Sequence, residues 1–166
     1  MERLWTPWRM EYLQSDKPDG CIFCMMLGSD DDKSCLILHR GRKAFVVLNR
    51  YPYNNGHLMV VPHDHVNMLE DLDDDTLMEL MQLVNKGMAA LRETMSPHGF
   101  NIGVNLGKAA GAGIDDHVHV HVVPRWDGDT NFMAVLAGTR MMPEMLDQTC
   151  SRLTAVLRKS LETPQA

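Results

Sequence analysis

The segment Asp115–Arg125 reads Asp-Asp-His-Val-His-Val-His-Val-Val-Pro-Arg and constrains the fold of this chain more than any other stretch. Strict alternation of this kind is typical of a β-strand, because successive side chains point to opposite faces of a sheet. We therefore predict a strand over His117–Val123, with the valines packed beneath the sheet. His117, His119 and His121 then share the other face, with anchor points about 7 Å apart.

A row of three imidazoles supports two kinds of chemistry. Imidazole is a good nucleophile at phosphorus near neutral pH. The middle ring, His119, has a neighbour on each side that can fix its tautomer or protonate a leaving oxygen. His-x-His is also a common metal-ligand spacing, and three buried structural histidines are a third explanation. The segment alone leaves phosphate chemistry and metal binding open.

Composition narrows the classes of protein to consider. The 166 residues are 45% hydrophobic and 23% charged, as expected for one globular domain. The net charge of −6 argues against a nucleic-acid partner but leaves room for a small phosphorylated ligand. No apolar run approaches the roughly 20 residues that cross a bilayer, and the first residues lack a signal-peptide core. We expect a cytoplasmic protein with no membrane contact.

Hydrophobic periodicity predicts two helices. Apolar residues recur every three or four positions from Leu77 to Met95, with Thr76 and Glu79 as a capping box at the start. Ser96-Pro97 should end this helix. A second helix is predicted over Pro143–Leu161, with the proline in its first turn.

Short β-rich runs at 36–38, 44–48, 57–62 and 101–106 predict further strands, and residues 28–33 read as a solvated loop. Strands followed by helices indicate an α+β fold with an antiparallel β-sheet, one main helix and a C-terminal helix. We expect a single domain over residues 1–166. It would carry an aromatic N-terminal extension over 1–20, docked on the domain or on a partner subunit, and a C-terminal helical tail over 140–166.

Two cysteines lie close together in Cys-Ile-Phe-Cys. In a reducing cytosol, a pair spaced like Cys21 and Cys24 suggests metal or redox chemistry before a disulfide. The alternative is a pair of buried thiols at a strand edge. Cys35 and Cys150 read as small core residues.

The run His-Val-His-Val-His-Val-Val resembles the signature of the histidine-triad (HIT) superfamily of nucleotidyl hydrolases and transferases. The similarity extends from Cys21 to Met133 and implies a HIT-like fold. It also implies that His119 attacks the α-phosphorus and forms a nucleotidyl-histidine, while the Gly56-His57 pair abuts the triad. The catalytic histidines implied by the resemblance are His57, His117, His119 and His121.

The same resemblance implies a nucleotide site. Asn49 would bind ribose hydroxyls, Asn105 would face the phosphates, and the glycine-rich loop Gly107–Gly113 would offer backbone amides. The implied nucleotide-binding residues are Asn49, Asn105, Gly107, Gly111, Gly113 and His121.

The segment Pro124–Phe132 looks most like the dinucleoside-polyphosphate branch of the superfamily, which includes bacterial diadenosine tetraphosphate phosphorylases and Fhit-like hydrolases. We expect cleavage of such dinucleotides with no catalytic cofactor. Many relatives carry a hydroxyl residue just before the triad where this chain has Gly113 or Ile114, so we expect water to be the acceptor. The alternatives are a phosphorolytic phosphorylase, a Hint-like nucleoside phosphoramidate hydrolase, and a nucleotide-binding sensor without turnover.

The resemblance also bears on metal and partners. Some bacterial HIT proteins close a structural zinc site with two cysteines, a histidine in a Pro-x-x-His segment and the first triad histidine. In this chain those residues are Cys21, Cys24, His65 and His117, a tetrahedral set for zinc. HIT proteins are usually homodimers. The expected partners are therefore a second copy of the chain and an adenine dinucleotide or AMP derivative.

Overall fold

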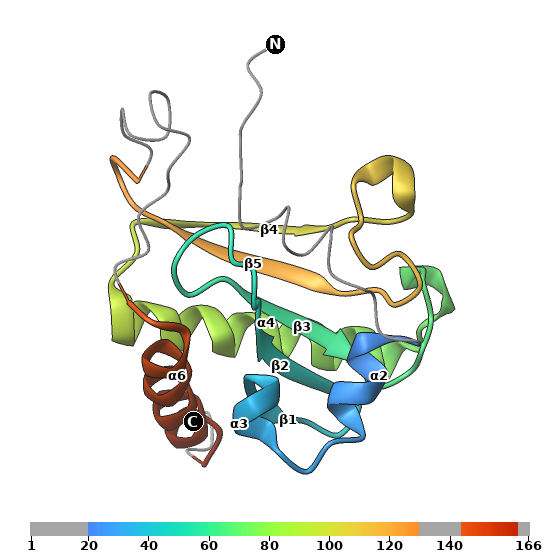
Figure 1. Ribbon diagram of the computed structural model, residues 1–166, viewed down its shortest axis with the longest axis horizontal. Helices are drawn as coiled ribbons and strands as arrows, with labels where there is room; N and C mark the ends of the chain where they lie inside the picture. The colour runs from blue at the N-terminus through green and yellow to red at the C-terminus, as the bar shows by residue number, and fades with distance from the viewer. Residues whose placement is uncertain (1–19, 130–143, 163–166) are drawn as a thin grey trace.

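An antiparallel sheet forms the centre of the structure, a computed structural model that describes residues 20–129 and 144–162. Within these residues its five strands lie in the order β1-β2-β3-β5-β4, and each neighbouring pair is antiparallel. Helix α4 packs on β2, β3 and β5, and α6 packs on α4 and β1 (Figure 1). The predicted α+β fold with an antiparallel sheet is confirmed.

The elements follow one another with short connections. In chain order they are α2 (Ile22–Leu27), α3 (Asp32–Cys35), β1 (Ile37–Arg40), β2 (Ala44–Leu48), β3 (Leu58–Pro62), η1 (Leu69–Asp71), α4 (Asp74–Met95), β4 (Gly99–Val104), η2 (Lys108–Ala110), β5 (Val120–Arg125) and α6 (Leu146–Glu162).

The two faces of the sheet have different neighbours. Every residue of β2 and β3 is buried, which accounts for their uninterrupted apolar sequences. Leu58 packs against Gly87 of α4, where an added Cβ would lie 3.3 Å from the leucine side chain. Leu58 pairs with Val122, and the next residues, Met59 and His121, pair on the opposite face. The histidine face of β5 is therefore the one that α4 does not cover.

The strand that carries the triad begins later than predicted. Strand β5 starts at Val120, so His117 and His119 precede the regular ladder. This stretch instead pairs once with the loop after β3, where the Val118 amide donates to the Val66 carbonyl (2.7 Å). The alternation persists, because the interleaved valines are buried. The rings of His119 and His121 turn toward each other, with centroids 4.7 Å apart.

The start of the main helix was also predicted wrongly. Asp73 is the N-cap of α4, and its carboxylate accepts a hydrogen bond from the Thr76 amide (2.7 Å). An aspartate in this position is a better cap than a threonine three residues inside the helix. Glu79 faces the sheet and accepts from the Lys43 amide (3.1 Å). The helix ends before Ser96, as predicted.

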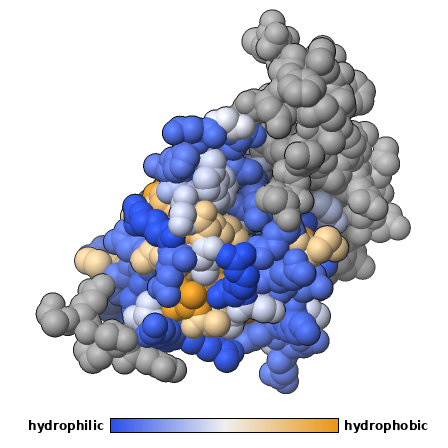
Figure 2. All heavy atoms as spheres, turned by 90° about the vertical axis from the view of Figure 1, so that its left-hand side faces the viewer, coloured by the Kyte–Doolittle hydropathy of each residue, from blue (hydrophilic) through white to orange (hydrophobic). Residues whose placement is uncertain are grey.

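Smaller differences concern the two ends of the chain. The predicted loop 28–33 runs into the one-turn helix α3, and α6 begins at Leu146, three residues later than expected. The aromatic extension and Pro143 lie outside the described residues, apart from Gly20. None of the described helices is long and apolar enough to cross a membrane. Figure 2 views the end where α6 lies, and its coloured surface is mainly hydrophilic because the apolar side of α6 is buried.

Candidate functional site

A pocket opens on the face of the sheet that α4 leaves uncovered. Its apolar wall comes from Ile22, Phe23 and Met26 of α2, with Leu48 and Met59 from the sheet. Helix α2 brings Phe23 onto the triad, with its ring centroid 5.0 Å from that of His119 and 5.4 Å from that of His117. The polar side of the same pocket includes Asn49, Asn105, Gly113, His119 and His121.

The tautomer of His119 follows from its backbone contact. Its Nδ1 lies 2.9 Å from the His117 carbonyl oxygen, which can only accept a hydrogen bond. In the neutral ring Nδ1 therefore carries the hydrogen, and Nε2 keeps its lone pair. Burial lowers the pKa of His119 below its ordinary value of 6.5. The ring is thus held neutral near pH 7, in the form that can attack phosphorus.

A second hydrogen-bond chain sets the tautomer of His121. The Tyr53 amide donates to His57 Nδ1 (3.1 Å), so the hydrogen of neutral His57 lies on Nε2. His57 Nε2 lies 3.0 Å from His121 Nδ1 and donates to it. His121 then carries its own hydrogen on Nε2, where it can serve as a donor to a bound phosphate.

Of the three residues in this hydrogen-bond series (Tyr53, His57 and His121), His57 is the most deeply buried. Its side chain is fully buried, and this burial, together with the neighbouring His121 and His119, lowers the pKa of His57 to about 3. Because His57 stays neutral, its hydrogen bond from the Tyr53 amide fixes which nitrogen of His121 accepts from it, without adding a charge. His57 therefore acts through His121.

The remaining predicted nucleotide-binding residues separate into two groups. Asn49, Asn105 and Gly113 line the pocket. Asn49 Oδ1 accepts from the Tyr51 amide (2.9 Å), which holds the chain after β2 in a turn beside the pocket. Gly107 and Gly111 flank η2 and are not among the pocket-lining residues. Their φ angles are 76° and 83°, which glycine adopts without steric cost, so backbone conformation accounts for a glycine at both positions.

The four predicted metal ligands come together in space. Cys21, Cys24, His65 and His117 each offer one ligand atom, and these four atoms lie within 4.8 Å of one another. His117 Nε2 lies 3.0 Å from the Pro62 carbonyl, so the hydrogen is on Nε2 and Nδ1 keeps a lone pair. That Nδ1 faces the sulfurs of Cys21 (3.3 Å) and Cys24 (3.7 Å). Two thiols and two imidazoles in this arrangement form a group that could hold a metal ion.

Several pocket residues were not predicted from the sequence. The wall residues of α2 lie in and beside the Cys-Ile-Phe-Cys segment. A predicted helix starting after Cys21 would have placed them on one side of that helix. Tyr53 stacks on His57, with ring centroids 4.7 Å apart, and also lines the pocket. Nothing in the local sequence distinguishes this tyrosine from an ordinary turn residue.

A neutral imidazole with a free ring-nitrogen lone pair beside an apolar pocket, on an antiparallel sheet, is suited to a class of protein that reacts with phosphate esters. The chain matches the HIT domain over residues 31–128. It is 42% identical over 158 residues to a protein of Mycobacterium tuberculosis named AP-4-A phosphorylase, covering 90% of this chain and 80% of that one.

More distant relatives agree with this assignment. The adenosine 5'-monophosphoramidase hnt1 of Schizosaccharomyces pombe is 29% identical, over 64% of this chain and 74% of that one. A zinc-bound histidine triad family protein of Mycobacterium smegmatis superposes with a TM-score of 0.70 at 26% identity, covering 85% of this chain and 95% of that chain. The protein belongs to the HIT family of nucleotide hydrolases and transferases.

Proposed function

We propose that the protein cleaves dinucleoside polyphosphates through a nucleotidyl intermediate on His119. The observation that carries this proposal is the His119 ring, whose Nδ1 is bound to the His117 carbonyl while Nε2 keeps its lone pair in a ring that lines the pocket. Nε2 attacks the α-phosphorus and forms an N–P bond. The bond from that phosphorus to its bridging oxygen breaks, and the nucleoside polyphosphate leaves with the electron pair.

In the second step an oxygen of the acceptor attacks the same phosphorus. The P–N bond breaks, its electron pair returns to Nε2, and the proton of the acceptor passes to solvent. The His121 Nε2–H group meets the charge that develops on the phosphoryl oxygens. Asn49 is proposed to bind the ribose, and the apolar wall with Phe23 the base. Neither step calls for a cofactor.

Two observations favour different acceptors. The relative named AP-4-A phosphorylase supports diadenosine tetraphosphate as substrate and phosphate as acceptor. The pocket position Gly113 favours water, because glycine has no hydroxyl to offer a phosphate acceptor. Arg50 is a cation that lines the pocket, and its Nη2 donates to the Ser34 carbonyl (2.7 Å). Arg125 and Lys108 are not among the lining residues: Arg125 binds Asp129 (2.6 Å), and Lys108 lies 3.6 Å from Asp115. Phosphorolysis is therefore the second candidate function.

Product analysis tests both. The purified protein is incubated with diadenosine tetraphosphate, with and without phosphate at millimolar concentration, and the nucleotides are separated. ADP with ATP identifies phosphate as acceptor, and AMP with ATP, unchanged by phosphate, identifies water. Cleavage of adenosine phosphoramidate alone would move the protein to the phosphoramidase branch. Absence of any turnover would contradict the proposal.

We also propose that Cys21, Cys24, His65 and His117 hold a structural zinc ion. Support comes from the donor set, from the lone pair that the Pro62 contact leaves on His117, and from the zinc-bound relative. Burial raises the pKa of the Cys21 thiol, which the positive charge of a bound cation would oppose.

The homodimer and the cytoplasmic location stay predictions. Strand β4 lies at the edge of the sheet with Ile102 46% exposed, and an open edge of this kind suits pairing with a second copy. Light scattering on the purified protein measures the oligomeric state.

A further inference from the structure

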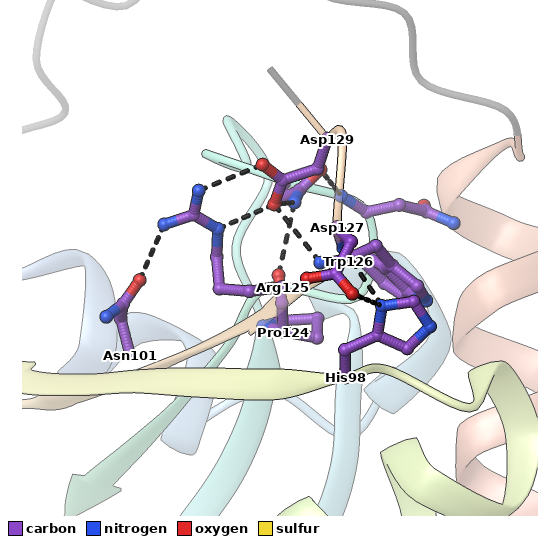
Figure 3. Close-up of polar contacts among 9 residues, drawn as sticks. His98, Asn101, Pro124, Arg125, Trp126, Asp127 and Asp129 are labelled. Carbon is purple, nitrogen blue, oxygen red and sulfur yellow. Dashed lines mark hydrogen bonds and ion pairs between the residues drawn. The ribbon is translucent and has the colours of Figure 1, made fainter.

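A buried carboxylate lies just beyond the end of β5. The Asp129 side chain is 10% exposed and forms a two-pronged ion pair with Arg125, whose Nε and Nη2 donate at 2.6 and 2.9 Å. Its Oδ2 also accepts from the Trp126 amide (3.3 Å) and from Asn54 Nδ2 (2.9 Å). Figure 3 shows this network, in which Asp129 is the common acceptor.

Asn54 connects this network to a turn that is distant in sequence. Its Nδ2 donates to Asp129 and to the Pro124 carbonyl (3.1 Å), and its Oδ1 accepts from the Asn55 amide (3.1 Å). Its own carbonyl accepts from the His57 amide (3.1 Å). The Asn54 side chain thus joins the turn 53–57 to the end of β5.

This junction lies where the backbone pairing of the two segments stops. The β3–β5 ladder ends at the pair Leu58 and Val122. Beyond that pair, on the side of the turn, the Asn54 side chain is hydrogen-bonded to residues at the end of β5. His57 precedes β3 and His121 lies on β5, so the Asn54 link spans the two segments that carry this histidine pair.

We infer that Asp129 is a positioning residue for nucleotidyl transfer, acting through Asn54 on the turn whose Tyr53 amide sets the tautomer of His57. The expected effect on kcat rests on the proposed function, whereas the expected effect on the His57 tautomer does not. If the turn shifts, the Tyr53 amide no longer forces the hydrogen of His57 onto Nε2. His121 can then turn a lone pair instead of a hydrogen toward the phosphate, and lone pairs repel phosphoryl oxygens.

The chain supplies a matched control two residues away. Asp127 lies in the same turn after β5, but its side chain is 95% exposed and its partner is His98 (3.1 Å). Replacing either aspartate by asparagine removes one negative charge at almost constant volume. Only the change at Asp129 alters the hydrogen bond from Asn54 Nδ2. A second test variant, Asn54→Ala, removes the link while leaving the Arg125 ion pair of Asp129 in place.

The experiment compares wild type, Asp129→Asn, Asn54→Ala and Asp127→Asn on diadenosine tetraphosphate. We expect kcat to fall on the order of tenfold to a hundredfold in the first two variants, since small misplacements of catalytic groups have effects of this size. The Kd of AMP should stay within about twofold, because α2 and Asn49 are untouched. Asp127→Asn should behave as wild type.

A tautomer measurement separates positioning from loss of structure. In ¹⁵N-labelled protein, the imidazole shifts of His57 should report hydrogen on Nε2 in wild type and Asp127→Asn, and a mixture in Asp129→Asn and Asn54→Ala. The groups that face His57 are His121, His119 and Tyr53, so their signals are followed together. This measurement remains informative if the wild type does not cleave the dinucleotide.

The outcomes are separable. Unchanged His57 shifts in both link variants would overturn the inference whatever the kinetics show. So would a kcat in Asn54→Ala equal to that of Asp127→Asn. If Asp129→Asn does not fold, Asn54→Ala decides alone. A mixed His57 tautomer with reduced kcat and retained AMP binding supports the inference.

Discussion

At the level of single residues, hydrogen bonds set the tautomer of each of the three neighbouring histidines, His117, His119 and His121. The Pro62 carbonyl accepts the Nε2 hydrogen of His117, which leaves the Nδ1 lone pair directed at the cysteines. The His117 carbonyl accepts the Nδ1 hydrogen of His119, which leaves Nε2 unprotonated. His57 gives His121 a hydrogen on Nε2. Each assignment follows from one oxygen or amide whose hydrogen-bonding role is unambiguous.

The first prediction concerns the nucleophile. His119→Ala should lower kcat by at least about a thousandfold, because the covalent step is lost, while AMP binding measured by calorimetry is largely kept. His98→Ala, a change at an exposed ring, serves as the control. A His119→Ala variant with a tenth of the wild-type rate would show that another group attacks the phosphate.

The second prediction concerns pH and folding. Burial lowers the folded-state pKa of His57 to about 3, against 6.5 in the unfolded chain, so the unfolded state binds the extra proton. The stability from a neutral His57 is present above about pH 6.5 and is lost as the pH falls toward 3. Between pH 7 and pH 5 the loss is about 2 kcal/mol from this residue.

Urea unfolding of wild type and His57→Gln at pH 7 and pH 5 measures this contribution. The glutamine variant should lose less stability over the interval than wild type, because it lacks the group whose pKa is lowered in the folded state. Equal losses in wild type and His57→Gln would mean that His57 takes up a proton in the folded protein as well.

At the level of elements, α2 links the pocket to the rest of the domain. This helix of six residues has no basic residue in its last turn. Its C-terminal end is held from β1, where Arg40 donates to the carbonyls of Leu27 (2.7 Å), Met26 (3.1 Å) and Ser29 (2.6 Å). Hydrogen bonds from a charged donor are suited to the unpaired carbonyls of a helix end.

The third prediction follows from this contact. Arg40→Met should raise the KM for the dinucleotide about tenfold, equivalent to about 1.4 kcal/mol, with a much smaller change in kcat, because α2 forms the apolar wall. The control is Arg42→Met. The Arg42 side chain is 86% exposed and has Glu79 as its ion-pair partner at 3.7 Å. An unchanged KM in Arg40→Met would show that α2 holds its place without this arginine.

At the level of the whole molecule, the Cys/His group ties distant parts of the chain together. Cys21 and Cys24 belong to the α2 region, His65 follows β3, and His117 precedes β5. A metal at this point would cross-link three segments whose ends are otherwise separated by long stretches of chain. Metal binding would then contribute directly to the stability of the fold.

The fourth prediction tests that contribution. Protein purified without chelator should contain about one zinc per chain by elemental analysis. Cys21→Ser with Cys24→Ser should release it and lower the melting temperature, whereas Cys35→Ser, outside the group, should keep the metal. Metal-free wild-type protein with an unchanged melting temperature in the double variant would contradict the proposed zinc site.

What could be predicted from the sequence depended on neighbours along the chain. The alternation at His117–Val123 indicated the shared histidine face, and the spacing from Leu77 to Met95 indicated α4. Boundaries were less accurate, as at Val120 and Asp73, because a strand begins where a partner strand is available and a helix begins at its best cap. The HIT motif identified the family, since its residues are contiguous.

Only the tertiary structure placed residues that are distant in sequence. Phe23 meets His119 because α2 folds onto the triad, and Asp129 meets Asn54 across 75 positions. The tautomers depend on single carbonyls and amides, such as those of Pro62 and Tyr53. A local pattern reports the repeat of a helix or strand, which involves residues a few positions apart. Contacts across the sheet depend on how the packed elements meet, and no local pattern records that.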